Sequence, residues 1–221
     1  MAVVATVLAV VAVAGVFAYD RHFATPAPAR LALPAPTSSP GTSNAGSSTA
    51  ALDGTWNVGR TSIVGYRVAV DAFGLSKTIV GRTNRVWGSV TVARGRVATG
   101  SFSVDMASFR GGKRERELID AGHYRTATFV LTGPITLAGG STDGAARHYT
   151  AMGELNLRGQ TTPVTLVVSQ ERDGAIFYVL ADTSIAFARW HVQLPFGVKS
   201  HGTIEVLLGL VRGPGNRGLA G

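Results

Sequence analysis

From about Gly54 onward, apolar residues recur at every second position along several segments of the chain. This spacing is typical of β-strands with one buried face, because successive side chains of a strand point to opposite sides. Turn dipeptides containing glycine separate the segments, and Asp173-Gly174 is the strongest hairpin signal. The clearest alternating segments are 64–70, 98–106 (with Ala98 and Phe102 on one face), 129–137, 151–157 and 204–210.

The number and length of these segments constrain the architecture. Roughly eight or nine strands in meander order, without helices to cover them, must bury their apolar faces on one another, as in a barrel or a sandwich. The strands are long, which favours a barrel. One short helix is expected over Lys113–Ala121, with Gly122 placed to end it. The sequence therefore predicts an all-β antiparallel barrel with one short helix.

The N-terminal part of the chain has a different composition. Residues 1–19 carry no charged side chain, and their number is close to the ~20 residues that an apolar helix needs to cross a bilayer. We therefore interpret residues 1–23 as a transmembrane anchor or a signal peptide, with the anchor slightly favoured. An uncleaved segment would hold an extracytoplasmic domain at the cell membrane, whereas cleavage after Ala18 would release a secreted protein.

Residues 24–52 form a spacer in this interpretation. The segment contains five of the nine prolines, is rich in Ser and Ala, and has Arg30 as its one charged residue. Such a composition cannot form a core, and a spacer needs no sequence-specific contact. The expected folded domain covers residues 53–213, followed by a flexible tail at 214–221.

Charge and motifs restrict the function. The net charge is +8, but the basic residues are scattered, and their one cluster, around Arg110 and Arg116, is interrupted by glutamates, so no nucleic-acid partner is expected. The chain has no cysteine, which excludes disulfides and thiol catalysis. Its five histidines are dispersed and the familiar nucleophile, zinc and phosphate-loop motifs are missing, so we expect no metal, no cofactor and no enzymatic activity.

Short motifs along the chain resemble, in order, those of the YceI-like lipid/polyisoprenoid-binding proteins. They are Gly54-Thr55-Trp56, Val64-Gly65-Tyr66-Arg67, Val80-Gly81-Arg82-Thr83, Val104-Asp105-Met106, the Arg/Glu-rich helix, Ala127-Thr128-Phe129, and Gly153-Glu154-Leu155 leading through Gly159 to Pro163-Val164. The resemblance implies an eight-stranded, lipocalin-like barrel with an elongated apolar cavity for a polyisoprenoid or other amphiphilic lipid in the cell envelope. It also implies that homodimers can form. The sequence departs from the family pattern at Arg114-Glu115-Arg116-Glu117 and at Arg158, so a relative's headgroup preference does not transfer.

The candidate ligand-binding residues are the apolar residues at every second position, which are expected on the inward face of the strands: Val64, Tyr66, Val68, Phe102, Val104, Met106, Phe129, Leu131, Leu155 and Leu157. A filled core would show the same periodicity. Glycines that interrupt the apolar faces, such as Gly81 and Gly153, favour a cavity because a missing side chain leaves room, although they could equally mark bends. Candidate residues of a mouth or lid are Arg110, Arg114, Arg116 and His123; their segment could also be an ordinary solvated face.

Three functions are compatible with these observations. The leading hypothesis is binding, carriage or sequestration of a long apolar lipid inside the barrel. The alternative is a solidly packed barrel that acts as an envelope interaction module without a lipid ligand, docking through its arginines. A third hypothesis, modification of an isoprenoid with His123 or His191, has no catalytic motif to support it.

Overall fold

The computed structural model describes residues 26–35, 52–72, 74–109, 122–137 and 146–213. Almost all regular structure in these residues is β-strand, accompanied by the short 3₁₀ helices η2 (Met106–Ser108) and η3 (Phe187–Trp190). The predicted all-β class is confirmed. The helix expected over 113–121, the N-terminal apolar helix and the tail 214–221 lie outside the described residues.

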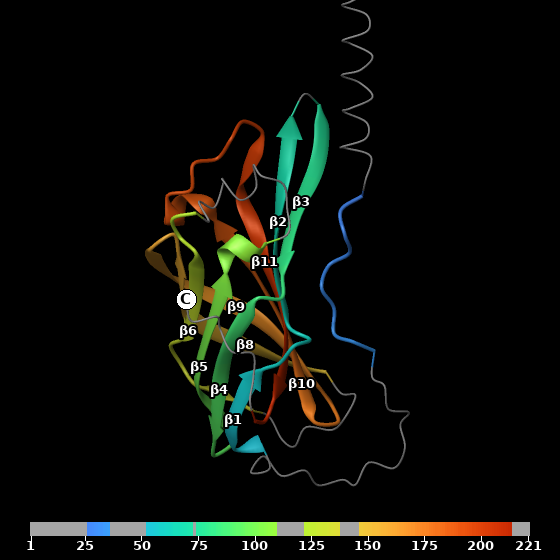
Figure 1. Cartoon of the computed structure of the whole chain (residues 1–221), viewed down its shortest axis with the longest axis vertical. Helices are drawn as coiled ribbons and strands as arrows, with labels where there is room; N and C mark the ends of the chain where they lie inside the picture. Colours follow the sequence, from blue (N-terminus) through green and yellow to red (C-terminus); the bar gives the residue numbers. More distant parts are fainter. Residues whose placement is uncertain (1–25, 36–51, 73, 110–121, 138–145, 214–221) are drawn as a thin grey trace, which may run out of the picture.

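Eight antiparallel strands close into a barrel (Figure 1). Each strand pairs with its neighbours in the ring, and β1 completes it by pairing with β11 through Asn57↔Val211 and Val58↔Leu210. The predicted eight-stranded barrel is therefore confirmed. In ring order the strands are β1 (Gly54–Val58), β4 (Val86–Ala93), β5 (Arg96–Asp105), β6 (Thr126–Leu131), β8 (Arg147–Leu157), β9 (Gln160–Asp173), β10 (Ile176–Ala186) and β11 (Val198–Val211).

A hairpin of β2 (Ile63–Ala72) and β3 (Leu75–Thr83) extends the sheet beyond the ring. One edge of β11 pairs first with β2 and then, nearer its C-terminal end, with β1. The chain bends between β1 and β2, where Gly59 N–H donates to the Gly209 carbonyl at 2.7 Å. The hairpin consequently projects at one end of the molecule, which we call the hairpin end (Figure 1). The two-residue strand β7 (Ile135–Thr136) pairs with β5.

The tight turns follow the predicted glycine dipeptides. Arg94 and Gly95 have φ of 54° and 70°, and Arg158 and Gly159 have φ of 53° and 73°. Two successive left-handed residues match the twist of the strands that they connect, which is why such turns suit hairpins. The predicted hairpin at Asp173-Gly174 is confirmed, because Asp173 of β9 pairs with Ile176 of β10 across the turn.

The alternation predicted for 98–106 is wrong at its first residue. Ala98 is exposed because the β4–β5 register shifts there, with Thr99 opposite Thr91 but Val97 opposite Val92. An extra residue in one strand reverses the side to which the following side chains point. Val97 therefore faces the interior in place of Ala98.

Residues 26–35 contain no helix or strand, yet they lie along the outside of β2 and β3 (Figure 1). Arg67 and Arg82 donate hydrogen bonds to the carbonyls of Pro28 and Ala29. The expectation that the spacer makes no specific contact is therefore wrong for this segment, which we call the strap. Within the described residues, no helix is both long enough and apolar enough to span a bilayer.

Candidate functional site: a cavity inside the barrel

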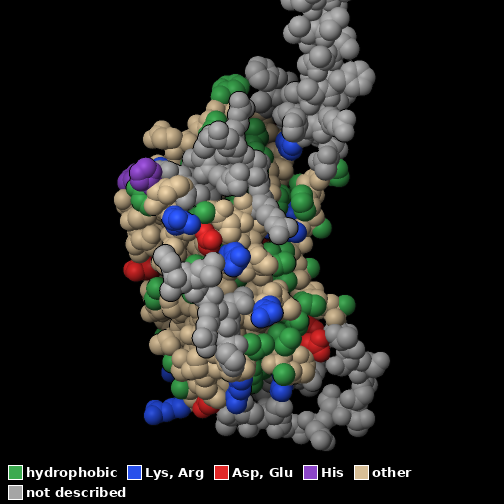
Figure 2. Space-filling model, viewed as in Figure 1, with side chains coloured by type: hydrophobic (Ala, Val, Ile, Leu, Met, Phe, Trp, Pro, Cys, Tyr) green, Lys and Arg blue, Asp and Glu red, His purple; other side chains and the backbone are tan. Residues whose placement is uncertain are grey.

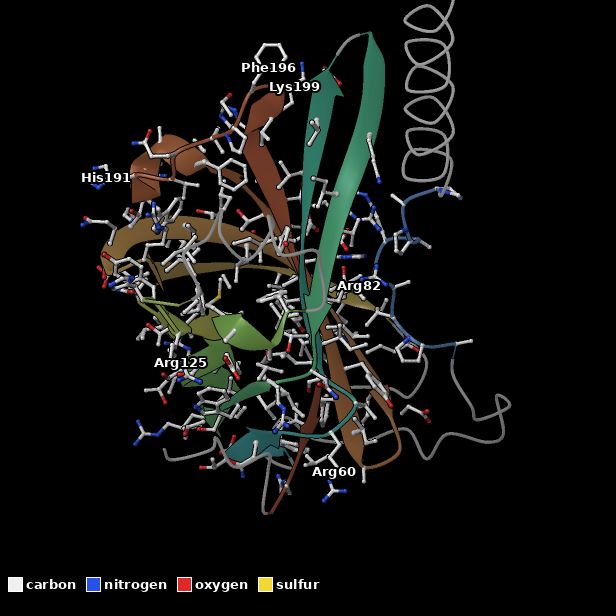
Figure 3. All side chains as sticks on the ribbon, turned by 45° about the horizontal axis from the view of Figure 1, so that its top comes forward. Arg60, Arg82, Arg125, His191, Phe196 and Lys199 are labelled. Atoms are coloured by element: carbon white, nitrogen blue, oxygen red, sulfur yellow. The ribbon has the colours of Figure 1, made fainter. Side chains whose placement is uncertain are left out.

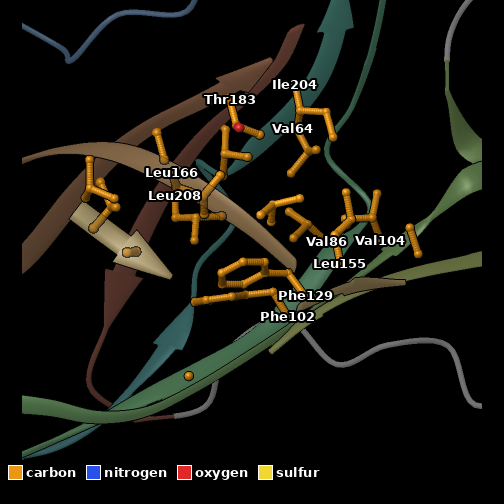
Figure 4. Close-up of a pocket in the computed structure, with 18 of the residues that line it drawn as sticks. Val64, Val86, Phe102, Val104, Phe129, Leu155, Leu166, Thr183, Ile204 and Leu208 are labelled. Atoms are coloured by element: carbon orange, nitrogen blue, oxygen red, sulfur yellow. The ribbon is translucent and has the colours of Figure 1, made fainter. Parts of the chain in front are cut away.

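The barrel encloses a cavity of about 240 Å³. Most of its wall comes from the ring strands β4 to β11, and β2, which pairs with β11, completes the wall on one side (Figure 4). All ten of the candidate ligand-binding residues line it. The volume is slightly below the range of about 300–1,000 Å³ typical of small-molecule pockets. The interior is therefore hollow along part of its length.

The cavity is elongated along the strands. On β10 its wall runs from Val179 to Ile185, and on β11 from Ile204 to Leu210. Six residue steps of a strand cover about 20 Å. A long, slender molecule fits this space better than a compact one of the same volume.

The wall is almost entirely apolar. Its side chains are aliphatic or aromatic, except for Thr128, Gln170 and Thr183, of which Thr183 is labelled in Figure 4. Among the described residues, no charged side chain and no histidine lines the cavity. A charged group moved into it would lose its hydration without gaining a counter-charge, which is strongly unfavourable. The cavity therefore suits an uncharged hydrocarbon chain.

Aromatic rings lie flat against the wall where glycines leave space for them. A Cβ added to Gly153 would lie 2.3 Å from the Phe129 ring, and one added to Gly81 would lie 2.4 Å from the Tyr66 ring. Phe129 in turn stacks on Phe102, with ring centroids 6.5 Å apart. These glycines therefore keep the cavity open indirectly, by letting large rings lie back against neighbouring strands.

Packed aromatic residues lie toward both ends of the interior. At the end opposite the hairpin, Trp56 meets Phe177 edge to face with centroids 4.6 Å apart, and the Arg212 guanidinium lies over Trp56. At the other end, η3 buries Phe187 and Trp190, and the Trp190 indole donates to the Leu155 carbonyl at 3.3 Å.

The candidate mouth residues are only partly located. Arg110, Arg114 and Arg116 lie outside the described residues. His123 is exposed, next to Tyr124, and takes no part in the cavity wall. His191 is also exposed, and its carbonyl accepts a hydrogen bond from Arg158. No group of three or more His, Cys, Asp or Glu side chains among the described residues could hold a metal ion.

Sequence reasoning missed the cavity residues of β9 and β10. Along β10, the run from Phe177 to Ala181 is apolar at every position, so it shows no period of two that would separate the inner from the outer face. Pairing supplies the missing information, since Ala181 lies opposite Val206 of β11, whose face was predicted. The missed residues are Val164, Leu166, Val168, Gln170, Val179, Ala181, Thr183 and Ile185.

Comparisons with known proteins agree with this architecture. Two solved structures are similar in fold. One is the crystal structure of Burkholderia cenocepacia BcnA, which has 22% sequence identity to this chain and a TM-score of 0.54. The match covers 67% of this chain and 95% of the BcnA chain. The other is a polyisoprenoid binding domain from Saccharophagus degradans, implicated in plant cell wall breakdown, which has 13% sequence identity to this chain and a TM-score of 0.52. The match covers 71% of this chain and 97% of that domain. No match was found among curated proteins.

The family assignment rests on a more direct comparison. A YceI-like domain model matches residues 46–210, which include the whole barrel ring except for the last residue of β11. The match agrees with the motifs noted in the sequence, and it covers well over half of the chain. The chain belongs to the YceI-like family.

Proposed function

We propose that the barrel binds a polyisoprenoid or a similar long apolar lipid and carries or sequesters it at the outer face of the cytoplasmic membrane. The observation that carries this proposal is the elongated, uncharged cavity inside the ring. The Saccharophagus degradans domain, whose fold is similar, is described as polyisoprenoid binding, which supports the same class of ligand.

The energetics of burial favour such a ligand. Each methylene group that moves from water into an apolar cavity contributes about 0.8 kcal/mol. Ten such groups contribute about 8 kcal/mol, which corresponds to a dissociation constant near 1 μM before the cost of ordering the chain. Tight binding therefore needs no ionic contact, and the wall offers none. A polar headgroup would remain outside the apolar section.

The location at a membrane is the second part of the proposal. It is supported by the uncharged apolar run of residues 1–19, whose length suits a bilayer. A protein that exchanges a water-insoluble lipid also benefits from remaining next to the bilayer that holds it. Retention of the run as an anchor would keep the cavity within reach of membrane lipids.

A pair of adjacent substitutions tests the binding site. Ala151 is buried and lines the cavity, whereas its neighbour Met152 is 61% exposed on the outer surface. We expect Ala151→Phe to fill the cavity and abolish the rise in melting temperature that a long-chain prenol or quinone produces in the full-length protein. Met152→Phe should retain that rise.

Ala181→Leu serves as a second, smaller filling substitution if the larger side chain prevents folding, because Ala181 also lines the cavity. An unchanged response of a folded Ala151→Phe or Ala181→Leu protein would contradict binding in the cavity. The same holds if none of these lipids changes the melting temperature of the unsubstituted protein.

A further inference from the structure

A second, smaller cavity of about 70 Å³ lies next to the main one. Residues of β4, β5, β9, β10 and β11 line both spaces, so a collar of shared side chains passes around much of the inside of the ring. The collar consists of Val90, Val97, Leu137, Gln170, Val179 and Leu210. The smaller space, which we call the end chamber, therefore adjoins the main cavity within the barrel.

Strand register places the end chamber beyond one end of the main cavity. On β4, the wall passes from Val90 in the collar to Val92, which lines the chamber alone. On β10, it passes in the same way from Val179 to Phe177. Val92 also lies opposite Val97 of the collar. The chamber therefore extends the interior by two residue steps, or about 7 Å along the strands.

The end chamber lies at the end of the barrel opposite the hairpin. Val58, the last residue of β1, pairs with Leu210 of the collar, and the bend at Arg60 follows directly. Figure 3 shows Arg60 at this end of the molecule and Lys199 at the other. The residues that line the chamber without reaching the main cavity are at most 8% exposed, and they are Leu52, Trp56, Val92 and Phe177. Buried side chains therefore bound the chamber.

Several contacts hold the two aromatic rings of the end chamber in place. The Trp56 indole N–H donates to the Leu52 carbonyl at 2.8 Å, and the Trp56 ring meets the Phe177 ring edge to face. The Arg212 guanidinium lies 4.8 Å from the centroid of the Trp56 ring, and the Arg172 guanidinium lies 5.5 Å from that of Phe177. Rings packed on several sides cannot move aside without strain, so they form a firm boundary.

The chemistry of the end chamber suits the apolar terminus of a chain rather than a headgroup. Its lining is aliphatic or aromatic, apart from Gln170 in the collar. Among the described residues, no charged side chain lines it. A hydroxyl or phosphate group placed there would lose its hydration, and a single amide could replace little of it. A hydrocarbon terminus, by contrast, gains free energy when it is buried.

The dimensions of the two spaces can be compared with those of an isoprenoid chain. Three bonds join successive Cα atoms across about 3.8 Å, so the four bonds of one isoprene unit extend about 5 Å. The main cavity, which is about 20 Å long, takes roughly four extended units. The end chamber, which is about 7 Å long, adds room for about one more. A chain that fills both spaces therefore has its terminal unit beside Trp56 and Phe177.

We propose that the end chamber selects the bound lipid by length: it takes the terminal isoprene unit of the longest chain that fits, roughly five units, and Trp56 and Phe177 stop longer chains. The proposal rests on the proposed function, because it requires an isoprenoid in the main cavity. A longer chain leaves a unit in water, which is unfavourable. A shorter chain leaves the chamber empty, so the lining lacks contacts that a full-length chain supplies.

Competition among prenols tests the end chamber in the full-length protein in detergent. An equimolar mixture of prenols with three to seven isoprene units is added, and native mass spectrometry measures the occupancy of each length. Val92→Phe fills the chamber from a position outside the main cavity. We expect occupancy by the preferred prenol, relative to the prenol one unit shorter, to fall about tenfold, because its terminal unit loses its site. Thr55→Phe, at an exposed position of β1, is the matched control and should keep the original length profile.

Phe177→Leu changes the chamber in the opposite direction and serves as the test if Val92→Phe does not fold. It enlarges the chamber, so occupancy by the prenol one unit longer than the preferred one should rise several-fold. A folded variant of either kind that keeps the length profile of the unsubstituted protein overturns the proposal. An equal loss of every length in Val92→Phe would place the headgroup in the chamber and would also overturn it.

The same spectra distinguish this proposal from the proposed function. An unsubstituted chain that takes up none of the prenols overturns both. Uptake of all lengths in equal proportion leaves lipid binding in the main cavity intact and overturns the end chamber alone.

Discussion

At the scale of single residues, the cavity depends on pairs formed by a glycine and an aromatic ring. Phe129 lies over Gly153, Tyr66 over Gly81 and Phe187 over Gly202, each closer than a Cβ would allow. The sequence indicated that inward glycines leave space, but it could not show that rings from adjacent strands take up that space. Which ring meets which glycine depends on strand register, and register comes from the pairing of the whole sheet.

Gly153→Ala tests this arrangement. The added methyl group would lie 2.3 Å from Phe129 and 2.6 Å from the Val130 carbonyl, so the ring must move into the cavity. We expect a loss of about 1–3 kcal/mol in the free energy of unfolding, as for other overpacked cores, together with weaker lipid binding. Urea unfolding and lipid titration measure the two effects. Gly133→Ala is the matched control, because no atom lies within 4 Å of its added Cβ; equal effects of the two substitutions would contradict this account.

At the scale of elements, the alternating strands could be predicted and the irregular ones could not. β6, β8 and β11 carry a clear period of two, so their inner faces were assigned correctly. β10 is apolar on both faces, and β5 contains the register shift at Ala98, so the pattern there is absent or reversed. The sequence predicted a barrel but not which strands close it, because closure depends on β1 and β2 sharing one edge of β11.

The bend between β1 and β2 has a specific polar support. Ser62 is fully buried, and its Oγ accepts a hydrogen bond from the backbone N–H of Gly209 at 3.0 Å. In Ser62→Ala this N–H would be left buried without its acceptor, which costs about 1–3 kcal/mol. We expect the urea midpoint to fall accordingly, while Ser200→Ala at an exposed position changes stability by less than about 0.5 kcal/mol. A Ser62→Ala protein as stable as the Ser200→Ala protein would show that the bend does not depend on this bond.

At the scale of the whole molecule, the sequence predicted the all-β barrel but not the docking of the strap on its outer face. The basic residues are dispersed over the face seen in Figure 2, in agreement with the scatter noted along the sequence. The strap was not foreseen, because a segment rich in Pro and Ala carries no pattern that predicts docking. Its contacts depend on Arg67, Arg82 and Glu205, which lie far apart in sequence and meet only once β2, β3 and β11 pair.

The central claim, that the barrel holds a long apolar lipid, is tested most directly by native mass spectrometry of the full-length protein extracted from membranes in a mild detergent. The account predicts a bound species whose added mass is that of a prenol, quinone or similar lipid, and that species should be missing from the Ala151→Phe protein. Recovery of the unsubstituted chain at its bare mass, with no lipid in an organic extract of the same sample, would contradict the account.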